Sequence, residues 1–441
     1  MISTGLKPQK FIEQLRIKRP HSKDDLPPWL TNLHEEGVKR FSDIGFPDPK
    51  NEEWKFTDIA PITEKSFHFP DEKTIAELRS FNEYVDRNEP TIVFINGFFS
   101  ARYSSLNGLE QGLTITNLAQ AVKDQPKIIQ SLLFRHDLKQ ENSFSALNSA
   151  FFKDGAFIQI SDNAVCNRLI HIIHIVSQQN DDTVIFPRNL IILGRSAQAE
   201  ILESYVSFSK IRYFTNAVSD VFVNEGAKLH YYKAQGESLN AFHLAGMRIA
   251  QEANSEVNTF TFSAGAQISR NDLSVTLDGE GAKAVLNGLY AVSGNQLVDN
   301  HTAIDHKPPR SLSTQLYKGI LDGNSRAVFN GKILVRREAQ QTNSYQLNKN
   351  ILLSPSCQIH TKPQLEIFAD DVRCTHGATI GQLNDDEIFY LQTRGIRKDF
   401  ATRMLLCGFI DDVTGKIPNV SARTKIDELL TKIFPALKCK I

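Results

Sequence analysis

Cysteine and tryptophan are scarce in this sequence, and neither sign of charge is in excess. The 441 residues include five Cys and two Trp, and 50 Lys and Arg balance 50 Asp and Glu. A chain without net charge has no basic field to hold nucleic acid or an anionic membrane surface, so we expect neither as a partner. The five Cys show no regular spacing, which argues against a disulfide framework. They are Cys166, Cys357, Cys374, Cys407 and Cys439.

Long hydrophobic runs are also lacking. The longest candidate, residues 169–176, carries two His and is far shorter than the roughly 20 residues of a membrane span. The first twenty residues contain no apolar core of a signal peptide. We therefore expect a soluble, reduced, cytoplasmic protein.

Common catalytic loops are missing as well. The sequence contains neither G-x-x-x-x-G-K-[ST] nor G-x-G-x-x-G after a strand, and it contains no G-x-S-x-G. These absences argue against nucleotide binding by such loops and against a serine hydrolase.

Short alternating strands, by contrast, dominate residues 156–371. Small residues such as Gly226 and Gly281 separate the strands, and the helical period is nearly absent. Such a run argues against a doubly wound sheet and favours a β-solenoid over a sandwich or barrel. Examples of the runs are 157–160, 169–176, 189–193, 228–232, 256–262, 272–277 and 327–335.

Helical patterns flank this strand region, so the chain divides into 1–155, 156–383 and 384–441. The first part is mixed and largely helical, and we expect Trp54 to anchor its arm on the core. The last part shows helices near 387–394, 397–413 and 422–434. Because a solenoid needs covered ends, we expect the flanking helices to cap it. The apolar stripe Ala401, Leu405 and Phe409 fits a cap or a docking surface equally well.

Residues 361–377, TKPQLEIFADDVRCTHG, concentrate soft metal ligands in one short run. If the backbone is extended, Cys374 and His376 share a face because they are two residues apart. Two ligands are too few for a closed metal site, so either the site is shared with another chain or the pair is structural.

Two other uses of this region remain open. Cys357 and His360 together with Cys374 and His376 supply a possible four-ligand zinc set, although the spacing lacks a C-x2-C pair. The acidic residues suggest a cytosolic β-helix enzyme that acts on a sugar or a polyanionic substrate. They are Glu366, Asp370 and Asp371.

The same region resembles a known family. The run KPQLEIFADDVRCTHGATIGQL, followed by IFYLQTRGI, is similar to the C-terminal signature of the SufD family of iron–sulfur cluster assembly scaffolds. The related SufB chains carry His-Glu-Ala where this chain has His376-Gly377-Ala378. Further matches are Glu53–Thr57, Asn96-Gly97, Leu147–Ala150, Tyr317–Gly319, Val328–Lys332 and Gln346–Asn348.

The resemblance implies a mainly β fold, a right-handed parallel β-helix with helical regions at both ends. It implies a non-catalytic scaffold that pairs with a SufB-like paralogue and binds a SufC-like ATPase through residues 384–441. Cys374 and His376 would lie at the SufB interface and bind iron or a transient, nascent Fe-S cluster with ligands from both chains. The chain itself would bind no nucleotide, and the family allows a reduced flavin on the complex and a homodimer without SufB.

Overall fold

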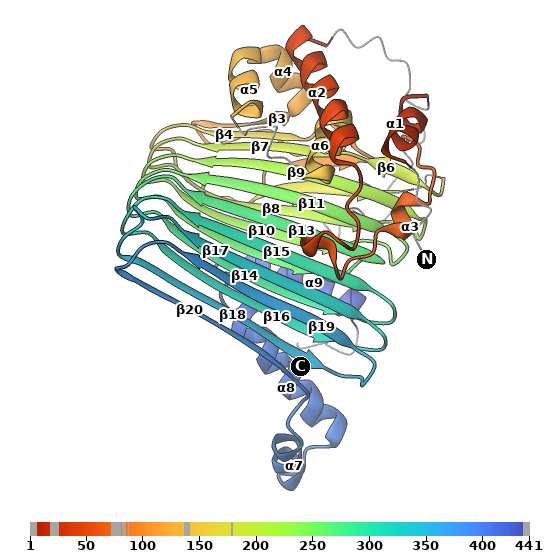
Figure 1. The fold of residues 1–441 in the computed structure, drawn as a ribbon, viewed down its shortest axis with the longest axis vertical. Helices are drawn as coiled ribbons and strands as arrows, with labels where there is room; N and C mark the ends of the chain where they lie inside the picture. Colours follow the sequence, from red (N-terminus) through yellow and green to blue (C-terminus); the bar gives the residue numbers. More distant parts are fainter. Residues whose placement is uncertain are drawn as a thin grey trace.

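Two long β-sheets face each other in the computed structural model (Figure 1). The structure describes residues 7–17, 26–71, 81, 85–86, 88–135, 142–177 and 180–434, and Cys439 lies outside them. The described strands form two ten-stranded sheets, and successive strands from β7 onward alternate between the sheets.

The first sheet contains β1 (Thr91–Ile95), β2 (Phe98–Phe99), β5 (Ile170–Val176), β8 (Gln198–Ser207), β10 (Lys228–Gly236), β12 (Glu256–Ser263), β14 (Lys283–Val292), β16 (Leu312–Leu321), β18 (Thr342–Leu352) and β20 (Val372–Gly381). The second contains β3 (Leu113–Asn117), β4 (Ala156–Ile160), β6 (Thr183–Ile185), β7 (Arg188–Leu193), β9 (Tyr213–Val223), β11 (Phe242–Gln251), β13 (Ile268–Leu277), β15 (Leu297–His306), β17 (Arg326–Val335) and β19 (Gln358–Ile367).

From β7 to β20 each strand pairs in parallel with the strand two positions away in the chain. Lys283 lies opposite Leu312, and Leu312 lies opposite Asn343, so side chains stack in columns along the molecule. This in-register stacking defines a parallel β-helix. The prediction of a mainly β fold with a parallel β-helix core between helical regions is confirmed.

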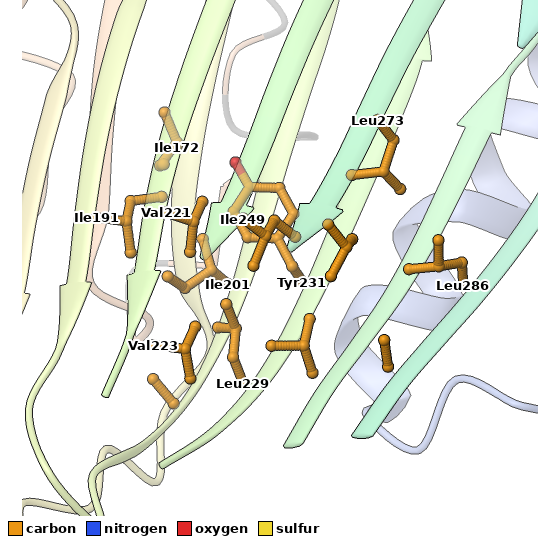
Figure 2. Close-up of a cluster of buried hydrophobic side chains, with 14 of the residues drawn as sticks. Ile172, Ile191, Ile201, Val221, Val223, Leu229, Tyr231, Ile249, Leu273 and Leu286 are labelled. Atoms are coloured by element: carbon orange, nitrogen blue, oxygen red, sulfur yellow. The ribbon is translucent and has the colours of Figure 1, made fainter. Parts of the chain in front are cut away.

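Inward-facing apolar side chains fill the space between the two sheets. Figure 2 shows part of this core, where Ile201 and Leu229 of the first sheet lie near Val221 and Ile249 of the second. Alternation explains the arrangement, because every second residue of a strand points into the coil.

The N-terminal helices cover the outer face of the second sheet and the first turns of the coil (Figure 1). Gly37 and Ala150 mark a close crossing of two of these helices, since a Cβ on Gly37 would lie 2.6 Å from the Ala150 backbone nitrogen. The elements are α1 (Pro8–Ile17), α2 (Pro28–Ile44), the 3-10 helix η1 (Glu52–Trp54), α3 (Ala60–Thr63), α4 (Leu118–Asp124), α5 (Pro126–Leu133) and α6 (Ser143–Phe151).

The C-terminal helices lie on the flank of the β-helix and leave its last turn uncovered in the described structure. They are α7 (Asp385–Thr393), α8 (Lys398–Thr414) and α9 (Val420–Ile433). Helix α8 packs on β14 and β16, and α9 packs on β10. The expectation that this tail caps the end is therefore wrong, because the outer face of the first sheet is apolar and attracts the helices. The buried face of α8 contains Leu406 and Ile410, one residue beyond the predicted Leu405 and Phe409.

Among the residues that the structure describes, no helix combines the length and the apolar character that crossing a membrane requires.

Candidate functional site

The last turn of the β-helix is open. In the described structure β19 pairs only with β17, and β20 pairs only with β18. Most side chains of these two strands are half-buried or exposed. Each strand thus presents a row of free backbone donors and acceptors, which is a template for a strand of another chain.

Cys374 lies on β20 with its side chain toward the inside of the coil. It packs with Leu365 and Val372 against a small apolar cluster that includes Ile333. Burial raises the pKa of the Cys374 thiol, and a hydrogen bond with the Ser344 backbone opposes this shift. The thiol is therefore protonated at neutral pH until a metal or greater exposure favours the thiolate.

His376 follows Cys374 by two residues and lies on the same inward face of β20. Its side chain is exposed because no further turn covers it within the described part of the chain. The two Cα atoms are about 6.6 Å apart along an extended strand. A soft sulfur ligand and an imidazole thus face one opening, and a tetrahedral ion would need two more ligands from elsewhere. The predicted shared face of Cys374 and His376 is confirmed, whereas their metal-binding role stays a prediction.

Polar residues continue below this pair in the columns of the first sheet. Ser344 is the register neighbour of Cys374, and its hydroxyl lies 2.7 Å from that of Ser313. The Ser313 hydroxyl lies 2.9 Å from His306 Nε2 of the opposite sheet. Burial lowers the pKa of His306 to about 4, so the ring is neutral. Sequence reasoning missed these residues, because only the pairing register places them under the open end.

An N-terminal arm, formed by residues 52–57, reaches the open end along the outside of the second sheet. Phe56 stacks on His360 of β19, with ring centroids 3.8 Å apart and an interplanar angle of 8°. Glu53 contacts His301 at 3.0 Å, and Thr57 donates a hydrogen bond of 2.6 Å to Asp299. A cavity of about 450 Å³ lies between this arm and strands β15, β17 and β19.

Trp54 is the anchor of this arm. Its side chain is buried, and the guanidinium carbon of Arg270 lies 3.8 Å from the ring centroid. The ring also contacts Phe144 of α6, at 5.3 Å between centroids. The predicted anchoring role of Trp54 is confirmed.

The zinc set proposed from the sequence does not form. Cys357 is buried in the turn before β19, where its sulfur contacts the Gly323 carbonyl at 3.4 Å. His360 points outward against Phe56, whereas Cys374 and His376 point inward from the other sheet. The described residues contain no group of three or more His, Cys, Asp or Glu that fits a metal ion. Alternation along β19 separates the ligands, because His360 falls on the outer face.

The acidic residues of the enzyme hypothesis lie on exposed surface. Glu366 forms an ion pair with Lys332 at 2.8 Å, and the two side chains are 45% and 40% solvent-accessible. Asp370 and Asp371 lie in the turn between β19 and β20, where both are exposed. Their placement gives no enclosed acid and base pair for a sugar substrate.

The cysteines differ from one another in chemical state. Cys166, Cys357 and Cys374 are free thiols. Cys407 of α8 is disulfide-bonded, which corrects the expectation of a fully reduced chain.

Comparisons with known proteins agree with this fold. The model of the SUF system FeS cluster assembly, SufBD core domain, matches residues 174–409, and the SufBD protein N-terminal region matches residues 7–172. An iron–sulfur cluster assembly SufBD family protein of Synechocystis sp. is 32% identical over 411 residues, which are 91% of this chain and 90% of that protein.

Two proteins named iron–sulfur cluster assembly protein SufD are also similar. The protein of Escherichia coli is 29% identical over 90% of this chain and 93% of its own length. The protein of Bacillus subtilis is 23% identical over 92% of this chain and 94% of its own length.

The β-helix, its open last turn and these matches define an iron–sulfur cluster assembly protein of the SUF type. The chain belongs to the SufBD family, and within that family it is SufD-like. The resemblance inferred from residues 362–395 is confirmed.

Proposed function

We propose that this chain is a non-catalytic scaffold subunit that pairs with a SufB-like paralogue across its open end. The observation that carries the proposal is the uncovered last turn, where β19 and β20 keep free edges beside Cys374 and His376. Strands from a second chain can continue both sheets, which satisfies the free backbone groups. A protein alone in solution seldom leaves two long edges of this kind unprotected.

Iron or a nascent Fe-S cluster is the cargo that fits this junction. Cys374 and His376 supply two ligands, and the paired chain supplies the others. Metal binding favours the thiolate over the protonated thiol and so offsets the raised pKa of Cys374. This role for the interface includes iron acquisition and early cluster assembly.

The C-terminal helices are the proposed docking surface for a SufC-like ATPase. Phe389, Tyr390, Phe400 and Met404 of α7 and α8 are exposed, with 66%, 58%, 49% and 44% of each residue accessible. Exposed aromatic and Met side chains on adjacent helices are typical of binding surfaces. Closure of the ATPase on ATP would strain the paired scaffolds and open the interface. A reduced flavin on the complex and a cytoplasmic location complete the proposal.

The proposal is tested on the complex purified under anaerobic conditions from the cytosol of the source organism. Tagged parent chain, His376→Ala and Cys374→Ser are compared for recovered partners and for iron and sulfide content. We expect all three to recover a SufB-like chain and an ATPase, and both variants to hold severalfold less iron and sulfide. His360→Ala is the matched control, because His360 lies on the outer face of the same end.

Two results would contradict the proposal. Cluster content equal to the parent in both variants would remove the ligand role and leave a structural subunit. Failure of the parent chain to recover either partner would remove the complex itself.

A further inference from the structure

The environment of Gln346 on β18 leads to an inference about His376. We propose that Gln346 is a positioning residue, whose side-chain carbonyl accepts the N–H of the His376 imidazole and leaves the other ring nitrogen for metal. The inference rests on the proposed metal-binding role of His376. It assigns a function to an inward-facing amide that sequence reasoning treated only as part of a motif.

The first argument is the position of the two side chains. Gln346 and His376 are register neighbours on β18 and β20, and both lie on the inward face of the first sheet. Adjacent strands are about 4.8 Å apart, so the two side chains lie within hydrogen-bonding reach of each other. Gln346 is completely buried beneath the exposed His376.

The second argument is the direction of the Gln346 amide. Its Nε2 donates a hydrogen bond of 3.2 Å to Oε1 of Gln315, which lies on β16, on the side away from β20. The two ends of an amide diverge from one carbon, so Oε1 faces away from Gln315. This Oε1 is buried and has no hydrogen-bond partner among the described residues. A buried amide oxygen without a partner is costly, and a ring N–H from His376 would satisfy it.

The third argument is that the Gln346 amide cannot turn over alone. Oε1 of Gln315 also accepts a hydrogen bond of 2.8 Å from the Thr302 hydroxyl, so it acts only as an acceptor. Reversal of Gln346 alone would place two oxygens against each other, so it would require Gln315 to reverse as well. Gly331 of β17 leaves the space that the amide occupies, since a Cβ there would lie 1.6 Å from Gln346 Nε2.

The chemical consequence is a fixed tautomer and ring orientation. A histidine that binds metal usually donates its other ring N–H to an outer acceptor, and loss of that acceptor costs 10- to 100-fold in metal affinity. In this chain the acceptor would come from the turn directly beneath the ligand. His376 would then be oriented before a partner or an ion arrives.

The first test is the ring tautomer of His376 in the metal-free full chain, read from imidazole ¹⁵N chemical shifts. We expect one tautomer in the parent and a mixture of both tautomers in Gln346→Leu. Tyr345→Leu is the matched control, because Tyr345 is adjacent on the outer face of β18 and 43% exposed. A parent ring with the tautomer ratio of free histidine would overturn the inference, and this result needs no variant to fold.

The second test is Co²⁺ affinity of the full chain, measured by titration. We expect Gln346→Leu to bind 10- to 100-fold more weakly than the parent. Gly331→Ala displaces the same amide without changing Gln346, so it should also bind more weakly. Parent affinity in Gln346→Leu and Gly331→Ala would contradict the inference.

The His376→Ala variant separates this inference from the proposed function. Parent Co²⁺ affinity in His376→Ala would contradict the ligand role and the positioning role together. Weak binding in His376→Ala with parent binding in Gln346→Leu would contradict the positioning role alone.

Discussion

Nε2 of His301 lies 2.9 Å from Asp299 Oδ1, while Nδ1 of the same ring lies 3.0 Å from Glu53 Oε2. Burial and Arg270 disfavour a charged ring, but Asp299 and Glu53 outweigh them and raise the pKa of His301 to about 9. Burial alone would raise the pKa of Asp299, yet His301 and Arg270 hold it near 2. The result is a charged His301 on β15 that forms ion pairs with Asp299 of the same strand and with Glu53 of the N-terminal arm.

These ion pairs predict that stability falls as the pH rises from 6.5 to 9. Below pH 6.5 the ring is protonated in the folded and unfolded chains, and the contribution is fully present. Between the two pKa values only the folded chain keeps the proton, so up to roughly 3 kcal/mol of unfolding free energy is lost. Urea unfolding at several pH values measures the loss, and His301→Gln should remove this part of the pH dependence. An equal slope in parent and variant would contradict the assignment.

Replacement of Trp54 by Ala should release the arm. Loss of a buried Trp that stacks on Arg270 costs about 3–5 kcal/mol of unfolding free energy. Trp29→Ala is the comparison, because Trp29 is only half-buried and should cost less. Urea unfolding of both variants measures the difference, and a Trp54 variant as stable as the parent would show that the arm does not brace the fold.

Charges introduced at the open end should block association without affecting stability. Phe368 and Ile380 are 62% and 49% exposed beside the free edges of β19 and β20. Lys at both positions would have to be desolvated in an interface, so we expect at least tenfold weaker self-association or partner binding. Sedimentation of the purified chain and pull-down of its partners measure the effect. Val420→Lys is the control on α9, where the residue is 77% exposed. An equal loss of binding in this control would contradict association through the open end of the β-helix.

Cys357 and Cys374 should respond in opposite ways to substitution by Ala. Cys357 belongs to the main core, so its loss should lower the unfolding free energy by about 1–2 kcal/mol and leave Co²⁺ binding unchanged. Cys374 is half-buried in the last turn, so its loss should weaken Co²⁺ binding with less effect on stability. Unfolding curves and metal titrations of the two variants measure these effects. Weaker Co²⁺ binding in Cys357→Ala would contradict the prediction and indicate a metal site shared by Cys357 and Cys374.

Alternation and spacing predicted much of this fold correctly. Strands at 157–160, 228–232 and 327–335 lie within observed strands, and Cys374 and His376 share a face as an i, i+2 pair should. These features depend only on neighbouring residues, whose geometry the strand itself determines.

The register between strands of successive turns could not be predicted from the sequence in the same way. Lys283, Leu312 and Asn343 occupy one column, yet they are 29 and 31 residues apart along the chain, so the repeat has no fixed length. The neighbours of the candidate site, Gln346 and Ser344, depend on this register. The prediction of a C-terminal cap was wrong for another reason. Helix α8 packs on an apolar surface at the side of the coil instead of on its last turn.

The N-terminal arm makes the two edges of the open turn unequal. Glu52 and Phe56 hold β19 through Lys362 and His360, and Glu53 reaches back to β15 and β17. Among the described residues, β20 has no comparable ion pair, ring contact or hydrogen bond with the arm. A stacked coil normally frays from its ends, one turn at a time. Here β19 cannot separate from β17 until the arm detaches. The β19 amide protons that hydrogen-bond to β17 should therefore exchange slowly, while the β20 amide protons that hydrogen-bond to β18 exchange fast.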